Sequence, residues 1–460
     1  MEAGASLDRG IPMQSSPLLN DPDRAWCRFE PSGEEPWDLP RVAHLHRRAG
    51  FSASWDALQR DLGDGPEASI DRILDGEPSA LDGSPAAEFD RLMDALARGP
   101  GAAGGAAGLQ ASWLYRMIHT PHPLRERMTL FWHDHFATSI EKVGDPDLMR
   151  RQVDLLRRCS LGSFAELLRT IARDPAMLIW LDATESKRQH PNENYAREVM
   201  ELFTLGRGQY TERDIQEAAR AFTGTVVVRG RYRHDPRQFD DGEKTVLGRT
   251  GRFDGDAIAD ILLDQPSCAR FLCRKLFSWF VSEVDEPSDA LIEPLALAYR
   301  DSDYDTRVPV AMILRSRLFF DPAIRRRRVK SPVEFAVGTI RALEILAPTV
   351  STQELAEACT RMGQALYAPP SVAGWDGGPA WINTATILAR SNAALALLDD
   401  RRRFDPEALA SRHGRSDDPA GFFVDLLVQD AFGPDVLDRI RGSAREAAAL
   451  VLTSPEYQLS

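Results

Sequence analysis

The sequence lacks most of the features by which common classes of protein are recognised. Its 460 residues include only 5 cysteines, and no two of them form a C-x-x-C pair, so neither a disulfide framework nor a cysteine zinc site is expected. No apolar run reaches the ~20 residues that a membrane-spanning helix needs, and the first residues lack the pattern of a signal peptide. We therefore expect a cytoplasmic protein that keeps its thiols reduced. The motifs H-E-x-x-H and G-x-S-x-G and the P-loop are also missing, so the hydrolase and nucleotide-binding classes that they define lose support.

Positive charge is also in deficit. The chain has 56 lysines and arginines against 69 aspartates and glutamates, a net charge of −13. This balance argues against nucleic acid or an anionic membrane as a general partner. The exception is the run RRRRVK at residues 325–330, just before Pro332. A phosphate-binding role is one interpretation of this run, and a solvated loop is the more common one.

Helical patterns fill most of the chain. Apolar residues make up 43% of it, enough for a sizeable core, and they recur with helical spacing between proline, glycine and capping signals. Residues 225–248 break this rhythm and predict a small β-hairpin excursion. We expect a mainly α protein, a large multi-helical domain in three parts. These are a poorly ordered tail at residues 1–36, a helical core at 37–400, and C-terminal helices at 401–460 packed on that core.

The stretch His190–Gly206, HPNENYAREVMELFTLG, predicts a single amphipathic helix. Pro191 suits its first turn, and Gly206 suits a left-handed stop. The apolar face is expected to hold Tyr195, Ala196, Val199, Met200, Leu202 and Phe203. The polar face is expected to hold Glu193, Asn194, Arg197, Glu198, Glu201 and Thr204.

Two interpretations of this polar face remain open. Glu193, Arg197, Glu198 and Glu201 are candidate catalytic residues, with Asn194 beside them, because residues three and four apart are neighbours on a helix and helical bundles build metal sites from inward carboxylates. Alternatively, Glu193, Arg197 and Glu201 form a ladder of ion pairs that supports a surface helix by a few tenths of a kcal/mol per pair. Burial of the face decides between them, because buried carboxylates need a metal or a function to explain them.

A divalent metal is the cofactor that these residue types suggest. His133 and His135 are candidate ligands together with Glu198, since imidazole and carboxylate suit Mn, Fe, Zn or Mg. On one continuous helix, however, the two histidines point about 200° apart and cannot share an ion. Further candidates for the site are Asp182, Asp241, Lys244 and Trp375.

Six stretches together resemble a known family. They are FWHDHFATS (131–139), DPAMLIWLD (174–182), residues 191–224, DDGEKTVLG (240–248), KSPVEF (330–335) and PPSVAGWDGGPAWI (369–382). The resemblance is to the bacterial family called domain of unknown function 1800, and it implies a mainly helical fold without naming a reaction. Genes of that family often neighbour those of domain of unknown function 1501, which looks like the alkaline-phosphatase and sulfatase superfamily, so a protein of that kind is an expected partner. One departure is Phe239, where many relatives have a histidine, and this weakens a metal site at that turn.

Two functions follow as hypotheses. The first is a metal-assisted enzyme in which His133 or His135 joins the carboxylates of the 190–206 helix at a cleft and Arg197 orients an anionic or polar substrate. The second is a non-catalytic scaffold or maturation partner of a phosphatase- or sulfatase-like protein. In that case the Trp375 loop would be a contact surface.

Overall fold

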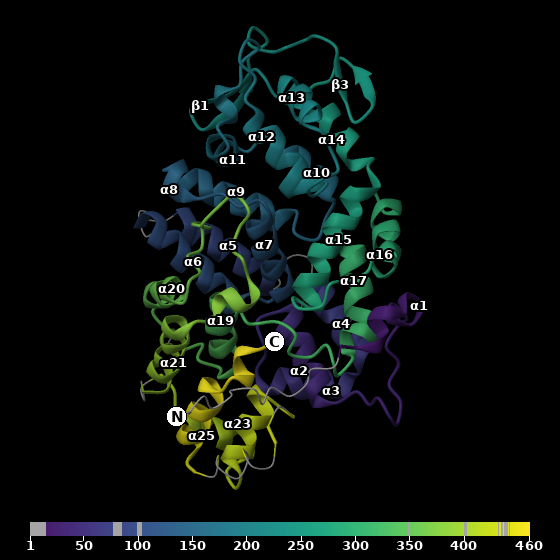
Figure 1. The fold of residues 1–460 in the computed structure, drawn as a ribbon. Coiled ribbons are helices and arrows are strands. Elements are labelled where there is room, and N and C mark those ends of the chain that lie inside the picture. The colour runs from purple at the N-terminus through teal and green to yellow at the C-terminus, as the bar shows by residue number, and fades with distance from the viewer. Residues whose placement is uncertain are drawn as a thin grey trace, which may run out of the picture.

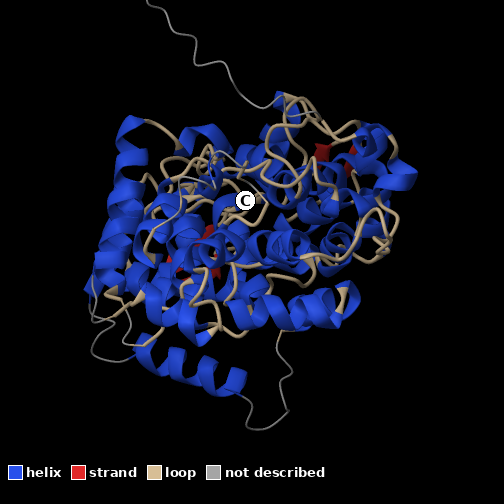
Figure 2. Cartoon of the chain, turned by 90° about the horizontal axis from the view of Figure 1, so that it is seen from below, coloured by secondary structure: helices blue, strands red, loops and turns tan. Residues whose placement is uncertain are grey.

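A computed structural model of the chain describes residues 15–76, 85–98, 104–347, 350–399, 403–430, 432–433, 436, 440 and 442–460. The described part consists mainly of helices joined by loops (Figures 1 and 2). The prediction of a mainly α fold is confirmed.

The helices follow one another along the whole chain. The amino-terminal ones are η1 (Pro17–Asn20), α1 (Pro22–Ala25), α2 (Leu39–Ala49), α3 (Trp55–Asp64), α4 (Pro66–Asp75), α5 (Pro85–Arg98) and α6 (Gly105–His119). The next are α7 (Pro123–His135), α8 (Ile140–Val143), α9 (Pro146–Arg158), α10 (Phe164–Ile171), α11 (Pro175–Trp180), η3 (Ala183–Glu185), α12 (Glu193–Glu198), η4 (Val199–Thr204) and α13 (Glu212–Ala221). Then come α14 (Gly255–Leu263), α15 (Pro266–Phe280), α16 (Asp289–Asp301), α17 (Arg307–Arg315), α18 (Arg317–Phe320), α19 (Pro332–Ala342) and α20 (Thr352–Arg361). The last are η5 (Gly378–Trp381), α21 (Thr384–Asp399), α22 (Pro406–Arg412), α23 (Pro419–Leu427), α25 (Ala444–Thr453) and η6 (Glu456–Gln458).

The predicted β excursion consists of two hairpins. Strands β1 (Thr225–Val228) and β2 (Arg231–His234) pair antiparallel, and so do β3 (Lys244–Val246) and β4 (Arg249–Gly251). Each hairpin turns on two residues with positive φ, at 229–230 and 247–248, as a tight hairpin turn requires. Both hairpins lie at one end of the molecule, near α13, and α23 and α25 lie at the opposite end (Figure 1).

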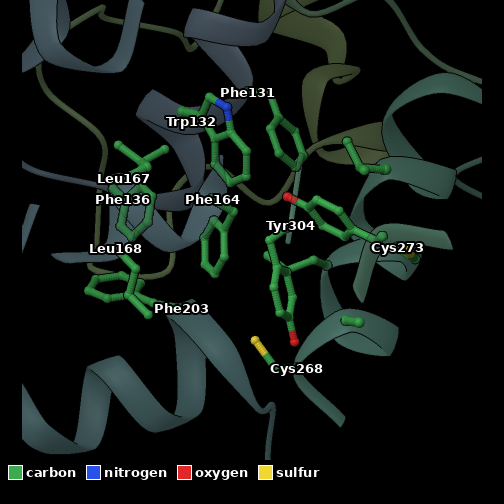
Figure 3. Packing of buried hydrophobic residues seen from close by; sticks show 14 of the residues in the cluster. Phe131, Trp132, Phe136, Phe164, Leu167, Leu168, Phe203, Cys268, Cys273 and Tyr304 are labelled. Carbon is green, nitrogen blue, oxygen red and sulfur yellow. The ribbon is translucent and has the colours of Figure 1, made fainter. Parts of the chain in front are cut away.

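An aromatic core forms where α7, α10, η4 and α15 meet. Phe136 lies with its ring centroid 5.0 Å from that of Phe203, and Trp132 lies 5.5 Å from Phe164 (Figure 3). These rings are all buried. Helix α7 therefore passes through the interior, and this places both of its histidines inside the molecule.

The part of the expected N-terminal tail that the structure describes contains two short helices. Residues 1–14 lie outside the described part of the chain. Residues 15–36 carry η1 and α1 and pack on the helical body: the Trp26 indole N–H donates to the Leu291 carbonyl at 2.7 Å, and Phe29 lies 4.9 Å from the Phe320 ring. At the other end of the chain, the Lys330 N–H donates to the Gln458 carbonyl at 2.8 Å. The proposed division into three parts stays a prediction.

The five cysteines are free thiols, of which Cys268, Cys273 and Cys359 are buried. Within the described residues, no helix combines the length and the apolar character needed to cross a bilayer. The expected cytoplasmic location stays a prediction.

Candidate functional site

The 190–206 stretch forms a helix that changes type halfway along. Helix α12 continues directly into η4, a π-helix, in which the Leu205 N–H donates to the carbonyl of Met200 five residues earlier at 2.9 Å. The helix begins after the cap residue Asn192, so Pro191 lies outside it, whereas Gly206 has the expected positive φ. The wider turn rotates the end of the helix, and Thr204, expected on the polar face, is buried with its hydroxyl donating to the Val199 carbonyl at 2.7 Å.

The polar face of this helix is partly exposed and its charges pair with neighbours. The Arg197 guanidinium donates to both oxygens of Glu212 at 2.9 and 2.7 Å and lies 3.4 Å from Glu193. Glu201 accepts from Arg207 at 2.7 Å and from the Tyr210 hydroxyl at 2.8 Å. Side-chain exposure is 41% at Glu193, 35% at Arg197 and 20% at Glu201. Of the predicted ladder, the Glu193–Arg197 pair is present, whereas Glu201 pairs with Arg207 in place of Arg197. The catalytic role of this face stays untested.

Glu198 differs from its neighbours on this face. It is half-buried, and burial together with the nearby charge of Glu201 raises its pKa. Asn194, beside it, uses its side-chain amide to donate to the Leu181 carbonyl at 3.1 Å, which ties the start of the helix to the end of α11. Asn194 therefore has a structural partner.

The predicted metal ligands do not meet. His133 accepts the Tyr367 N–H at 3.1 Å, and burial lowers its pKa to about 3. The His135 ring faces the other way, into the aromatic core, where Nε2 lies 3.1 Å from the Phe203 carbonyl. Across the described ranges, no three His, Cys, Asp or Glu side chains are grouped closely enough to hold a metal ion. The structure therefore does not bring His133, His135 and Glu198 together, because the turn of α7 separates the two rings and Glu198 lies on the polar face of another helix.

Three further candidates have local structural partners. Asp182 forms an ion pair with Lys142 at 2.8 Å, and Asp241 pairs with Arg188 at 3.2 Å on the surface. The ammonium group of Lys244 is buried, and it donates to the carbonyls of Asp240 and Gly242 at 2.5 and 3.0 Å. Lys244 thus fastens the turn before β3, and the structure does not bring these three residues together.

A cavity of about 360 Å³ lies elsewhere, where α7 and α15 meet the loops before α19 and around η5. This volume falls within the usual range for small-molecule sites. Its charged lining residues are Asp134, Lys275, Glu283, Arg328 and Asp376, and its aromatic ones are Phe131, Trp279, Trp375 and Trp381. Three of the stretches that resemble the family, FWHDHFATS, KSPVEF and PPSVAGWDGGPAWI, each supply lining residues, although these residues are as far apart in sequence as Phe131 and Trp381.

Asp134 is the central carboxylate of this cavity. Its Oδ1 accepts the Trp375 N–H at 2.8 Å, and burial raises its pKa to about 6. Gly374 makes this contact achievable: its φ is +87°, and a Cβ there would collide with both the carboxylate and the carbonyl of Asp134. Trp375, a predicted site residue, is therefore part of the cavity wall.

The floor of the cavity is a buried network of ions around Trp279. Arg328 donates to Oε1 of Glu283 through Nε and Nη2 at 2.9 and 2.7 Å, and to Oε1 of Glu334 at 3.2 Å. Arg127 forms an ion pair with the same Glu334. The two guanidinium carbons lie 4.5 and 4.9 Å from the Trp279 ring centroid, so both cations contact the indole ring.

The prediction of a solvated loop at residues 325–330 is wrong. Arg328 is only 3% exposed, and Arg325 and Arg326 pair with Asp430 at 3.0 and 3.2 Å. The Lys330 ammonium lies 3.4 Å from the Tyr457 ring centroid. Carboxylates and rings distant in sequence cover the run, so composition alone did not predict its burial.

Four residues of the cavity and its floor were not predicted from the sequence as site residues: Asp134, Lys275, Glu283 and Glu334. Glu334 had a detectable signal, because Ser331 and Glu334 have the S-x-x-E spacing of a capping box and form one at the start of α19. Asp134 lies between the two histidines that drew the metal hypothesis. Lys275 and Glu283 have no local signal.

Comparison with known proteins settles the family. Residues 44–459 match the sequence profile of a family described as protein of unknown function (DUF1800). The chain belongs to this DUF1800 family. A search of curated proteins and a search of solved structures gave no match. The function of this DUF1800 member therefore has to be argued from its own cavity.

Proposed function

We propose that the protein is an enzyme that acts on a small polar or anionic substrate in the Asp134 cavity, with Asp134 as the group that transfers a proton. The observation that carries this proposal is the position of Asp134: one carboxylate oxygen is fixed by the Trp375 N–H, and the side chain lines a cavity of small-molecule size. A general acid or base works best when its pKa lies near the working pH. Burial brings the pKa of Asp134 to about 6.

The surroundings of Asp134 support catalysis over a purely structural role. The loop that fixes it contains three glycines with positive φ, Gly374, Gly377 and Gly378, so the backbone comes close to the cavity. The ion pairs below hold Trp279 in place, which gives the site the rigidity that catalysis needs. A buried carboxylate whose pKa is raised lowers the stability of the folded protein at neutral pH. Shifted pKa values of this kind cluster at functional sites.

The test is a comparison of two matched carboxylate variants. Purified wild-type protein, Asp134→Asn and Asp174→Asn are incubated with a mixture of small polar metabolites, and depletion is followed by mass spectrometry. Asp174 is the control because burial also raises its pKa to about 6, but it caps α11 and does not line this cavity. We expect Asp134→Asn to lower turnover by about 10²–10⁴-fold. Equal turnover by wild type and Asp134→Asn would refute the proposal.

A divalent metal and the phosphatase-like partner stay predictions. Elemental analysis of wild type beside Glu198→Gln tests the metal, and purification from the native host tests the partner. Metal lost in Glu198→Gln would return the catalytic role to the 190–206 helix.

A further inference from the structure

Lys275 is a cation without a counter-ion in contact. It lies on α15, one helical turn before Trp279, and both side chains line the Asp134 cavity. Its ammonium lies 5.4 Å from the Phe271 ring centroid, and within the described ranges it forms no ion pair or hydrogen bond with the protein. Burial lowers its pKa, while the charge of Asp134 opposes this. A bound anion would stabilise the charged form of Lys275.

Lys275 and Asp134 face the same cavity without forming an ion pair. Asp134 uses one oxygen for the Trp375 N–H, and its second oxygen has no partner among the described residues. An ammonium and a carboxylate that share a cavity at a distance leave room for a ligand that contacts both. Such a ligand presents an acceptor to Lys275 and a donor to Asp134.

The network beneath the cavity is also charged. Among the described residues, Arg48, Arg127 and Arg328 are buried there near two carboxylates, Glu283 and Glu334. Burial and the charge of Arg328 hold the pKa of Arg48 and of Arg127 well below the usual value. Asp376 also lines the cavity, but it is exposed. Counted together with Lys275, Asp134 and Asp376, the lining and the network contain four cations and four carboxylates. The unpaired Lys275, and not an excess of positive charge, is therefore what offers an anion its contact.

We infer that the ligand is a small organic anion that carries a hydroxyl or amino group next to its carboxylate or phosphate. The anionic group binds Lys275, the hydroxyl or amine donates to Asp134, and the carbon skeleton packs against Trp279 and Trp375. This inference rests on the proposed function and gives its substrate class. The hydroxyl or amine is then the group whose proton Asp134 is placed to accept.

Binding is measured by tryptophan fluorescence in a buffer free of phosphate and carboxylate, because Trp279, Trp375 and Trp381 line the cavity. The probes are acetate and inorganic phosphate as bare anions, and two matched pairs, propionate against lactate and propyl phosphate against glycerol 3-phosphate. We expect saturable binding of at least one pair, with the hydroxylated member about threefold to tenfold tighter. The pair that binds identifies the anionic group.

Lysine variants test which cation binds. Lys275→Met is expected to weaken binding about tenfold or more, because a charge-assisted contact is lost. Lys275→Arg is expected to retain part of it, and Lys187→Met, at an exposed position, to change nothing. Thermal unfolding of each variant confirms that it is folded. Wild-type affinity in Lys275→Met, or no saturable binding of any probe by wild type, overturns the inference.

The two proposals fail separately. If anions bind through Lys275 but Asp134→Asn turns substrate over at the wild-type rate, the proton-transfer role fails while the anion site stands. If Asp134→Asn abolishes turnover of an uncharged substrate and Lys275→Met has no effect, the anion site fails while the proposed function stands.

Discussion

Two regions of this protein contain the same kinds of side chain and differ in what surrounds them. The polar face of α12 and η4 gathers three glutamates and an arginine within four turns of one helix, and its ion pairs are partly exposed. The Asp134 cavity gathers carboxylates, cations and indoles from four distant segments, and its ion pairs are buried. The first is conspicuous in the sequence and the second is visible only in the fold.

The difference shows that charge density along a helix is a poor guide to a site. Exposed charges on one helix face pair with each other and are hydrated by water, so their effect on the free energy of folding is small. Their presence is therefore weak evidence for a functional site. A charge brought into the interior has to be paired, and an imperfectly paired one persists where it serves a purpose. Lys275 and Asp134 are of this second kind, whereas Arg197 and Glu201 are fully paired at the surface.

The largest expected effect separates the two regions by stability. Arg328→Ala leaves Glu283 and Glu334 buried with one cation fewer, so the free energy of unfolding should fall by about 3–5 kcal/mol. Arg197→Ala removes an ion pair of similar length at the surface and should cost less than about 1 kcal/mol. Urea denaturation of both variants measures the difference. Equal losses would mean that burial does not distinguish the two regions.

The second prediction concerns the loop that fixes Asp134. Gly374→Ala adds both a strained φ and a collision with Asp134, and we expect it to cost about 2–4 kcal/mol and to change the tryptophan fluorescence. Gly248→Ala is the matched control: its φ is also positive, +78°, but no atom lies within 4 Å of the added Cβ. It should cost only about 1–2 kcal/mol. If the two losses are equal, strain alone matters and the loop does not need to approach Asp134 so closely.

The third prediction uses pH. Asp134 has a pKa of about 6 in the folded protein against an ordinary value of 3.8, so the folded state holds a proton that the unfolded state has lost between those values. Stability contributed by this group is therefore lost as the pH rises from about 4 to 6. Asp134→Asn cannot ionise, and allowing for the solvent that reaches the cavity, it should be about 1–2 kcal/mol more stable than wild type at pH 7. The gain should vanish near pH 4.

Urea denaturation at a series of pH values tests this expectation. Asp174→Asn is again informative, because burial also raises that pKa to about 6 and the variant should show the same dependence without loss of turnover. A stability gain together with lost activity in Asp134→Asn marks a group retained for function. A variant less stable than wild type at pH 7 would mean that the charge of Asp134 is fully compensated.

The local structure was largely predictable from the sequence. The sequence has the capping-box spacing at Thr211 and Asp214 and a cap residue, Asp174, just before Pro175, and both caps are present, because a cap depends on residues three or fewer apart. The break at residues 225–248 was also predicted, because a change of pattern among residues close in sequence marks it. The helix at 190–206 was placed correctly except at two points. It begins after Asn192, so Pro191 lies outside it, and its π turn depends on packing and left no sign in the apolar pattern.

The cavity was not predictable in this way. Its residues come from α7, α15 and two loops, and no spacing in the sequence relates Asp134 to Lys275 or Arg328 to Trp375. Even the burial of Arg328 follows from Glu283 and Glu334, which reach it only in the folded chain. A single sequence carries no information on such contacts, whereas it does carry the local signals that end a helix.

The smallest expected effect on stability is at Thr204, near the end of the 190–206 helix. Thr204→Val removes the buried hydrogen bond to the Val199 carbonyl and should cost about 1 kcal/mol. The control Thr170→Val removes a similar bond, 2.8 Å long, on the exposed side of α10 and should cost less. Hydrogen exchange at the Leu205 amide reports on the π turn directly. Faster exchange only in Thr204→Val would mean that this hydroxyl holds the turn, and with it the Phe203 carbonyl against His135; unchanged exchange would assign the turn to apolar packing alone.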